Sequence, residues 1–170
     1  MAGKDLILDF DEYDESNVLA DLAEIRRVNP HRHEMEQLTA IVFADAARQV
    51  VVGYKDLSNQ EFWIRGHMPN LPVMPGVLIC EMVAQLCSYF AVKYDLLGTS
   101  MVALGGLEEV RFRDPVLPGD RLVAVAQVAK HRRGALFVCR FQAFVRRQLV
   151  AEGSIKGVPM PVERLHRAGS

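Results

Sequence analysis

The sequence carries almost no net charge. Its 20 Lys and Arg residues are balanced by 21 Asp and Glu residues, which leaves a net charge of −1 at pH 7. Proteins that bind nucleic acid usually present a basic surface to the phosphate backbone. The composition therefore does not favour nucleic acid as a partner, and function has to be sought in individual residues.

Cysteines are few, and their spacing fits neither a disulfide framework nor a metal site. The three cysteines cannot all pair within one chain, and none of them forms a C-x-x-C motif. Each lies in an apolar segment, as is typical of reduced, buried thiols in a cytosolic protein. They are Cys80, Cys87 and Cys139. The sequence thus predicts no zinc site and a cytoplasmic location.

Targeting signals and long apolar runs are scarce as well. The first residues, MAGKDLILDFDEYDES, have neither the apolar core of a secretory signal nor the basic character of a transit peptide. Only residues 75–94 form a run long and apolar enough to span a membrane. This run contains Glu81, Gln85 and Lys93 and begins with Pro-Gly, which favours a buried core helix over a membrane span.

Short runs of β type dominate the chain from residue 38 onward. They are rich in β-branched and aromatic residues and are separated by turn residues. In sequence they are LTAIVF, QVVVGY, MVALGG, LEEVRFR, RLVAVAQVAK, ALFVCRFQAFV and QLVAEGSIKG. The first two are close enough to form a hairpin. Alternate residues from Phe137 to Val145 are all apolar, which predicts a sheet with one dry face.

One long helix is predicted amid these strands, from Pro75-Gly76 to about Leu96, and Gly98 closes it. The helix is apolar on almost every side, so it has to be enclosed. A curved antiparallel sheet wrapped around one long central helix meets this requirement, and that is the hotdog architecture. The sequence therefore predicts an α+β protein with the hotdog fold.

A single hotdog domain is expected over residues 25–160. Residues 1–24 are expected to form a mobile or loosely docked acidic arm followed by a short helix, which Ser16 caps and which runs to about Val28. Residues 161–170 are expected to form a C-terminal tail.

The start of the long helix carries the residues with chemical potential. His67 lies in a Pro/Gly-rich loop, and Glu81 lies about one and a half turns into the apolar helix. Alone, each has an ordinary structural interpretation, as a loop histidine and as an acid favoured by the helix dipole. Together with the backbone N–H of Gly76 they supply a base, an acid and an oxyanion donor. This set suits proton removal next to a thioester carbonyl with loss or addition of a hydroxyl, without any metal or redox cofactor.

The same stretch resembles the active-site motif of the β-hydroxyacyl-acyl carrier protein dehydratases of fatty-acid synthesis, the FabZ type. The family motif is H-F-P-G-x-P-[VI]-[MF]-P-G-V-L-x-x-E-x-x-x-Q, and the chain reads H-M-P-N-L-P-V-M-P-G-V-L-I-C-E-M-V-A-Q over residues 67–85. The resemblance includes the P-H-R triplet at residues 30–32 and the run VRFRDPVLPGD at residues 110–120. It covers about residues 25–159.

Two positions depart from this motif. Met68 replaces the usual Phe, and a flexible Met can reshape a pocket wall. Asn70 replaces the usual Gly, and Asn is the residue after Gly that best tolerates a positive φ. Since the reacting groups are retained, the departures indicate a divergent branch with a different acyl group or carrier.

The resemblance implies a role for each residue of the site. His67 would be the catalytic base, Glu81 the acid that binds or protonates the hydroxyl, and the Gly76 N–H the oxyanion contact. The Val73 carbonyl would hold the imidazole in the correct tautomer. His67 and Glu81 of one site would come from different subunits, so the resemblance implies a homodimer as the minimum active unit, which can assemble into a hexamer.

The resemblance further implies an acyl carrier protein as the partner. A basic cluster at a predicted strand turn would attract an acidic carrier, and it can equally be a soluble turn tip. Its residues are Lys130, His131, Arg132 and Arg133. Arg111 and Arg113 are further candidates, or form the wet face of a strand.

Three functions remain open at this point. Dehydration of a (3R)-hydroxyacyl thioester on a carrier protein has the most support. The second is that of a hotdog acyl thioesterase or a coenzyme A-linked hydratase. The third is that of a non-catalytic acyl-binding homologue.

Overall fold

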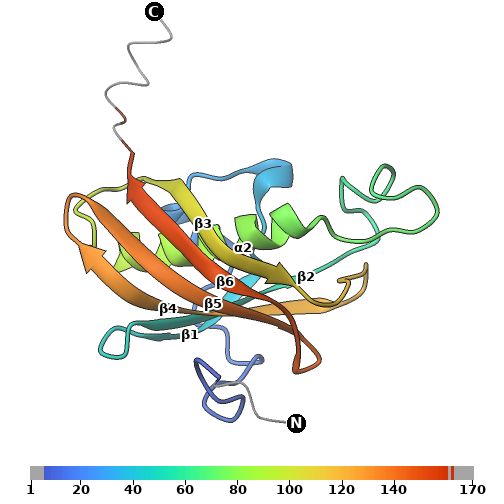
Figure 1. The fold of residues 1–170 in the computed structure, drawn as a ribbon, viewed down its shortest axis with the longest axis horizontal. Coiled ribbons are helices and arrows are strands. Elements are labelled where there is room, and N and C mark those ends of the chain that lie inside the picture. The colour runs from blue at the N-terminus through green and yellow to red at the C-terminus, as the bar shows by residue number, and fades with distance from the viewer. Residues whose placement is uncertain (1–5, 161, 163–170) are drawn as a thin grey trace, which may run out of the picture.

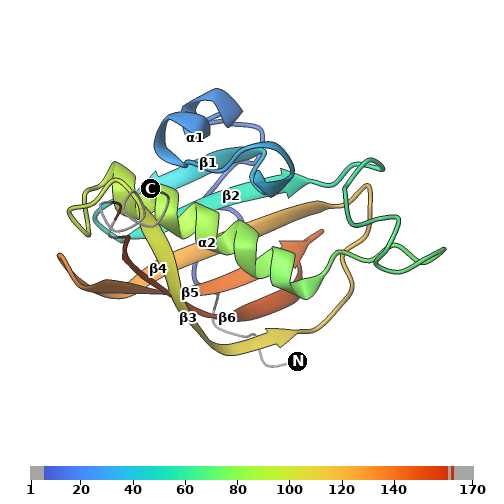
Figure 2. The ribbon, with the colours of Figure 1, turned by 90° about the horizontal axis from the view of Figure 1, so that it is seen from above.

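A computed structural model describes residues 6–160 and 162, and it contains one six-stranded antiparallel sheet curved around a long helix (Figures 1 and 2). In chain order the elements are α1 Leu22–Val28, the 3₁₀ helix η1 His33–Met35, β1 Ala40–Asp45, β2 Val50–Asp56, α2 Gly76–Lys93, β3 Val102–Phe112, β4 Arg121–Arg132, β5 Leu136–Val145 and β6 Gln148–Pro159. The strand order is β1-β2-β4-β5-β6-β3. The predicted hotdog fold is confirmed, as is the hairpin of β1 and β2. The predicted tail, 161–170, lies outside the described residues except for residue 162.

Helix α2 forms the centre of the core, as predicted. It contacts strands β2 to β6, and Met82, Val83 and Leu86 have no exposed surface. By length and composition alone α2 could cross a membrane, but 61% of it is buried inside the fold. The inner face of β5 supplies the apolar surface opposite the helix, with Phe137 and Phe141 both 1% exposed. This is the face of the strand that the alternating pattern predicted to be dry.

Strand β3 differs from the prediction, because it joins two runs that were expected to be separate strands. Residues 101–106 and 107–113 contribute to one strand that pairs with β6, and the register shifts around Gly105. A Cβ at Gly105 would lie 2.9 Å from the side chain of Val158. Glycine therefore marks a bulge where two backbones approach closely, and not a turn.

Strand β3 is also an edge strand, and among the described residues no strand pairs with its outer edge. Three of its large apolar side chains are exposed, namely Leu104, Leu107 and Phe112. A long, apolar, uncovered edge readily pairs with another strand. At the opposite edge of the sheet the cover is confined to one residue of β1, Ile41, whose carbonyl accepts the N–H groups of Leu19 and Ala20 and whose N–H donates to the Ala20 carbonyl.

Residues 6–16 cover the outer face of the sheet, so of the two expectations for the arm, mobile or loosely docked, this segment is docked. Leu8 is only 3% exposed and belongs to a second apolar cluster, which lies on the face of the sheet opposite α2. The Phe10 ring packs edge-on against Phe144, with 5.0 Å between the ring centroids. The Ile7 N–H donates to the side-chain oxygen of Gln142 over 2.9 Å. The acidic composition of the arm concealed these apolar anchors.

A signal for this cover was present in the strands themselves. In β2, Val50 and Val52 pack in the outer cluster, whereas Val51 packs against the core around α2. A strand that is buried on both faces reads as a continuous apolar run without alternation. The run QVVVGY has this pattern, which indicates that some segment must cover the outer face.

Helix α1 begins later than predicted. Asp21 caps it, because its side chain accepts the N–H of Glu24 over 2.9 Å. Ser16 bonds instead within the preceding turn, and Ala20 forms an isolated bridge with β1. The chain is therefore held beside β1 until residue 20 and can turn into a helix only afterwards. Asn29 ends the helix as predicted.

The packing of the arm predicts that Leu8→Ala lowers the free energy of unfolding by about 2–3 kcal/mol, because it leaves a cavity in a closed apolar cluster. Leu6 is 38% exposed, so Leu6→Ala is the matched control and should change the unfolding free energy by less than about 0.5 kcal/mol. Urea denaturation of both variants checks this. Equal, small effects would show that the arm contributes no packing.

Candidate active site

His67 lies in the loop between β2 and α2, and hydrogen bonds fix its backbone. Its N–H donates to the carbonyl of Trp63 over 2.8 Å, and its carbonyl accepts the N–H of Val73 over 3.0 Å. Trp63 is 4% exposed and packs in the core beside this loop. Asn70 adopts a φ of +63°, a conformation that Asn tolerates. The loop thus keeps a fixed shape with Asn where the FabZ-type motif has Gly.

The imidazole of His67 is oriented by a second bond to Val73. Its Nδ1 lies 2.8 Å from the Val73 carbonyl oxygen. A carbonyl can only accept, so we assign the proton of the neutral ring to Nδ1, which leaves a lone pair on Nε2. His67 is only partly buried, so this lone pair can reach a substrate. This orientation would suit a general base.

Helix α2 begins at Gly76, where the first backbone N–H groups have no partner within the helix. The Phe112 ring, at the end of β3, lies directly against this residue. A Cβ at Gly76 would lie 2.8 Å from Cζ of Phe112. Glycine therefore lets the end of β3 approach the start of the helix, a steric requirement that the sequence did not reveal.

Glu81 lies on the side of α2 that faces residues 29–37. The side-chain nitrogen Nε2 of Gln85 donates to Oε1 of Glu81 over 2.7 Å. Nε2 of His31 lies 3.4 Å from the same oxygen. Within the described residues no hydrogen bond reaches the other oxygen, Oε2. One oxygen of this carboxyl group is thus held, and the other is available.

Gln85 is 2% exposed and uses its whole amide. Besides Glu81, its Nε2 donates to the Met35 carbonyl over 2.6 Å, and its Oε1 accepts the N–H of Gln37 over 3.0 Å. The Asn29 side chain donates to the backbone carbonyl of Gln85 over 2.9 Å. These bonds fasten the segment 29–37 onto α2 beside Glu81. The polar minority of an apolar helix is thereby supplied with partners.

A small cavity of about 80 Å³ lies beside Glu81. His31, Glu81, Gln85 and Ser88 form its polar side, and β3, β5 and β6 form its other wall. It offers an apolar space next to an acid, although it is too small for a long acyl chain. His67 does not line it.

His67 and Glu81 do not meet within one chain. In the part of the chain that the structure describes, no hydrogen bond or ion pair joins them. In Figure 2 the loop before α2 extends past the end of the helix and away from the sheet, whereas Glu81 lies beside β3. A single subunit therefore presents the imidazole of His67 and the carboxyl group of Glu81 separately.

The basic cluster of Lys130, Arg132 and Arg133 lies at the turn between β4 and β5, next to the C-terminal end of α2. Arg133 donates to the carboxylate and to the carbonyl of Asp95, over 2.7 and 2.6 Å. An 18-residue helix is about 27 Å long. Within one chain this cluster and the loop of His67 therefore lie at opposite ends of α2 (Figure 2).

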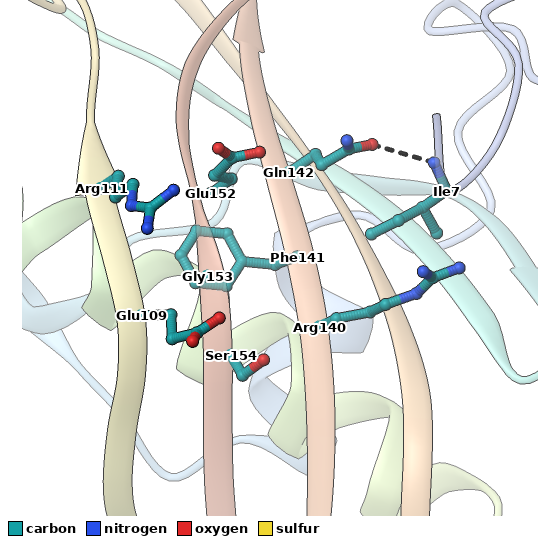
Figure 3. Close-up of a pocket in the computed structure, with 9 residues that line it drawn as sticks. All are labelled: Ile7, Glu109, Arg111, Arg140, Phe141, Gln142, Glu152, Gly153 and Ser154. Atoms are coloured by element: carbon teal, nitrogen blue, oxygen red, sulfur yellow. Dashed lines mark hydrogen bonds between the residues drawn. The ribbon is translucent and has the colours of Figure 1, made fainter. Parts of the chain in front are cut away.

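The outer face of the sheet carries a larger cavity of about 320 Å³, and among its lining residues Arg111 alone was a candidate, for carrier binding. Figure 3 shows Glu109 and Arg111 of β3, Arg140 of β5 and Glu152 of β6 around it, with Ile7 at one side. Acidic and basic side chains alternate there. Arg111 thus belongs to the wet face of the strand, which was one of the two interpretations of the VRFR pattern.

The three cysteines are buried and free, as predicted. Burial raises the pKa of the Cys80 thiol. A hydrogen bond with Cys87, together with burial, raises the pKa of the Cys139 thiol well above its usual range. Thiols that stay protonated are poor nucleophiles, so neither Cys80 nor Cys139 is a candidate for covalent catalysis.

Sequence comparison identifies relatives along most of the chain. Residues 29–154 match the family described as the FabA-like domain. The chain is 38% identical, over 83% of its length and 92% of that protein, to the 3-hydroxyacyl-[acyl-carrier-protein] dehydratase FabZ of Alkalilimnicola ehrlichii. It is 37% identical to the dehydratase FabZ of Campylobacter lari, over 82% of the chain and 97% of that protein.

Solved structures share the fold at low sequence identity. One is the dehydratase heterocomplex ApeI:P from Xenorhabdus doucetiae, with a TM-score of 0.68 and 14% identity over 86% of this chain and 97% of that one. Another is a sigma28-regulated virulence protein from Campylobacter jejuni, with a TM-score of 0.59 and 15% identity over 84% and 93%. These likenesses support the hotdog fold.

The bonds of Gln85 predict that Gln85→Leu lowers the free energy of unfolding by about 2–4 kcal/mol, because the Gln37 N–H and the Met35 carbonyl lose their partner. Gln60 is exposed, so Gln60→Leu is the control and should stay within about 0.5 kcal/mol of the wild type. Thermal and urea unfolding measure both. A stable Gln85→Leu variant would show that the segment 29–37 is held by other contacts.

Proposed function

Because the chain belongs to the family of proteins with a FabA-like domain, we propose that it is a (3R)-3-hydroxyacyl-[acyl-carrier-protein] dehydratase. It would remove water from a hydroxyacyl thioester and form the trans-2-enoyl thioester, in fatty-acid or related acyl biosynthesis. The observation that carries the proposal is the 2.8 Å bond between Nδ1 of His67 and the Val73 carbonyl, because it leaves Nε2 as a base.

The proposed reaction moves two protons, one from C2 of the substrate and one to its C3 hydroxyl. Nε2 of His67 removes a proton from C2, and the electrons of that C–H bond form the double bond between C2 and C3. The Gly76 N–H stabilises the charge that develops on the thioester oxygen. Glu81 gives its proton to the C3 hydroxyl, which leaves as water. Each turnover ends when His67 releases its added proton to solvent and Glu81 takes up a proton from solvent.

We further propose that the active unit is a homodimer, in which His67 of one protomer faces Glu81 of its partner. Two observations support this arrangement. In the described part of one chain Glu81 lines a cavity that His67 does not line, and β3 offers an open edge with Leu104, Leu107 and Phe112 exposed. A second copy paired along β3 would extend the sheet and bury these side chains. A hexamer would be a trimer of such dimers.

The proposed partner is an acyl carrier protein, which the names of the relatives include. Lys130, Arg132 and Arg133 remain the predicted docking residues, because an acidic carrier would be attracted to their charge. We also propose a cytoplasmic location, which the three buried, free cysteines support.

Removal of either reacting group should abolish turnover. Each of His67→Ala and Glu81→Gln should lower kcat about 10²–10⁴-fold, the usual contribution of a positioned base or acid. Glu34 is exposed, so Glu34→Gln is the matched control and should keep wild-type activity. Mass spectrometry of a hydroxyacyl-carrier substrate detects the loss of water. Release of free thiol without an enoyl product would indicate a thioesterase, and acyl-carrier binding without turnover would indicate a non-catalytic homologue.

A shared site predicts complementation between inactive variants. A mixed dimer of one His67→Ala and one Glu81→Gln chain has one intact site and one doubly altered site. Purified through two different tags, it should recover about half of the wild-type activity per dimer. The two parent homodimers, carried through the same procedure, should stay inactive. Absence of recovery in a verified mixed dimer would show that both residues act within one subunit.

A further inference from the structure

We propose that His31 is a positioning residue, which acts with Gln85 to hold Oε1 of Glu81 so that Oε2 faces the reacting hydroxyl. The inference rests on the proposed function, because the orientation of Glu81 matters only if Glu81 reacts. It assigns a role to a histidine that lies in the segment before β1, 50 positions away from Glu81 in the chain.

The donor to Oε1 decides which oxygen carries the acid proton. The side-chain NH₂ of Gln85 can only donate, so Oε1 has to accept at 2.7 Å. A protonated carboxyl group bonded in this way keeps its hydrogen on the other oxygen, Oε2. The contact therefore separates the two oxygens of Glu81 into a held acceptor and a free O–H donor.

His31 faces the same held oxygen. Its Nε2 lies 3.4 Å from Oε1 of Glu81, while its Nδ1 is buried and bonds no described protein group. With the proton on Nε2, the ring points a donor at Oε1. With the proton on Nδ1, the lone pairs of Nε2 and Oε1 would face each other and the buried Nδ1–H would have no acceptor. This tautomer therefore has a higher free energy than the one with the proton on Nε2. The first tautomer is therefore favoured. A separation of 3.4 Å is long for a hydrogen bond, as contacts in substrate-free active sites often are.

The backbone of His31 is held firmly enough for this task. Arg32 donates to the carbonyls of His31 and Asn29, over 2.6 and 2.9 Å. An ion pair of Arg26 in α1 with Glu36, at 2.6 and 2.8 Å, ties the far end of the segment back to the helix that precedes it. The bonds from Asn29 and Gln37 to Gln85 fasten the same segment to α2. His31 is therefore presented by a braced segment and not by a loose loop.

Without these donors the carboxyl group of Glu81 would have no preferred face. The terminal torsion of a Glu side chain is broad and nearly two-fold, so either oxygen can turn toward the cavity. In some conformers Oε1 would then face the hydroxyl in place of Oε2, and in others neither oxygen would point at it. Misplacement of a reacting group lowers the rate of the chemical step, and it changes the affinity for the substrate much less.

Two isosteric changes at His31 test the proposal. The amide of Gln reaches the place of the imidazole Nε2, whereas the shorter amide of Asn reaches only the place of Nδ1. His31→Asn should lower kcat by about ten- to a hundredfold with little change in KM. His31→Gln should recover kcat to within about threefold of the wild type. His33 is exposed in the same segment, so His33→Asn is the matched control and should leave both constants unchanged.

The same change in a Glu81→Gln background separates positioning from structural support. If His31 acts through Glu81, His31→Asn should not lower the residual kcat of Glu81→Gln further, since contacting residues are not additive. An equal loss in both backgrounds, or no rescue by His31→Gln, would overturn the positioning role. The melting temperature of each variant is measured to check that it is folded. If His31→Asn does not fold, His31→Ser replaces it, with the same expected loss of kcat.

The outcomes distinguish this inference from the proposed function. If Glu81→Gln is inactive while His31→Asn keeps full kcat, only the positioning role is wrong. If Glu81→Gln keeps full activity, the acid role of Glu81 in the proposed function is wrong, and the inference is wrong with it.

Discussion

Helix α2 must be enclosed on all sides, and most of the structure follows from this constraint. Its apolar sides are covered by the curved sheet, whose strands β2 to β6 all contact it. The remaining side carries Glu81, Gln85 and Ser88, which an apolar surface could not satisfy. The segment 29–37 covers that side with hydrogen bonds to Gln85. The same segment places His31 next to Glu81, so the contacts that close the core also bring these two side chains together.

The sequence predicted well those features that depend on contiguous residues. The bounds of α2, the dry face of β5 and the positive φ of Asn70 follow from local pattern and residue type. The same holds for the bond that joins His67 to Val73, only six positions away. Long-range contacts were not readable in this way. The partners of Gln85 at Asn29 and Gln37 are 56 and 48 positions away, and nothing in their local sequence indicates the pairing.

The errors had a common physical cause, which is that tertiary contacts override local composition. Acidic residues made the N-terminal arm look solvated, but Leu8 and Phe10 anchor it on an apolar sheet face, and arginines pair with its acids. Ser16 is a good helix cap, yet the chain continues beside β1 before α1 begins. Gly105 reads as a turn residue, although it serves close packing against Val158. In each case the missing information was the identity of the neighbour.

The two edges of the sheet differ in how far they are covered, and this difference bears on how copies of the protein could pair. The β1 edge is bridged at Ile41 by Leu19 and Ala20, whereas among the described residues no strand pairs with the outer edge of β3. In the proposed dimer, two copies joined along β3 would form a continuous sheet that ends in a β1 strand on each side. Each of these end strands is short and already bridged to the segment before α1, so it would be a poor template for a third copy. The proposed pairing would thus bury the apolar edge and leave only the less accessible edge exposed.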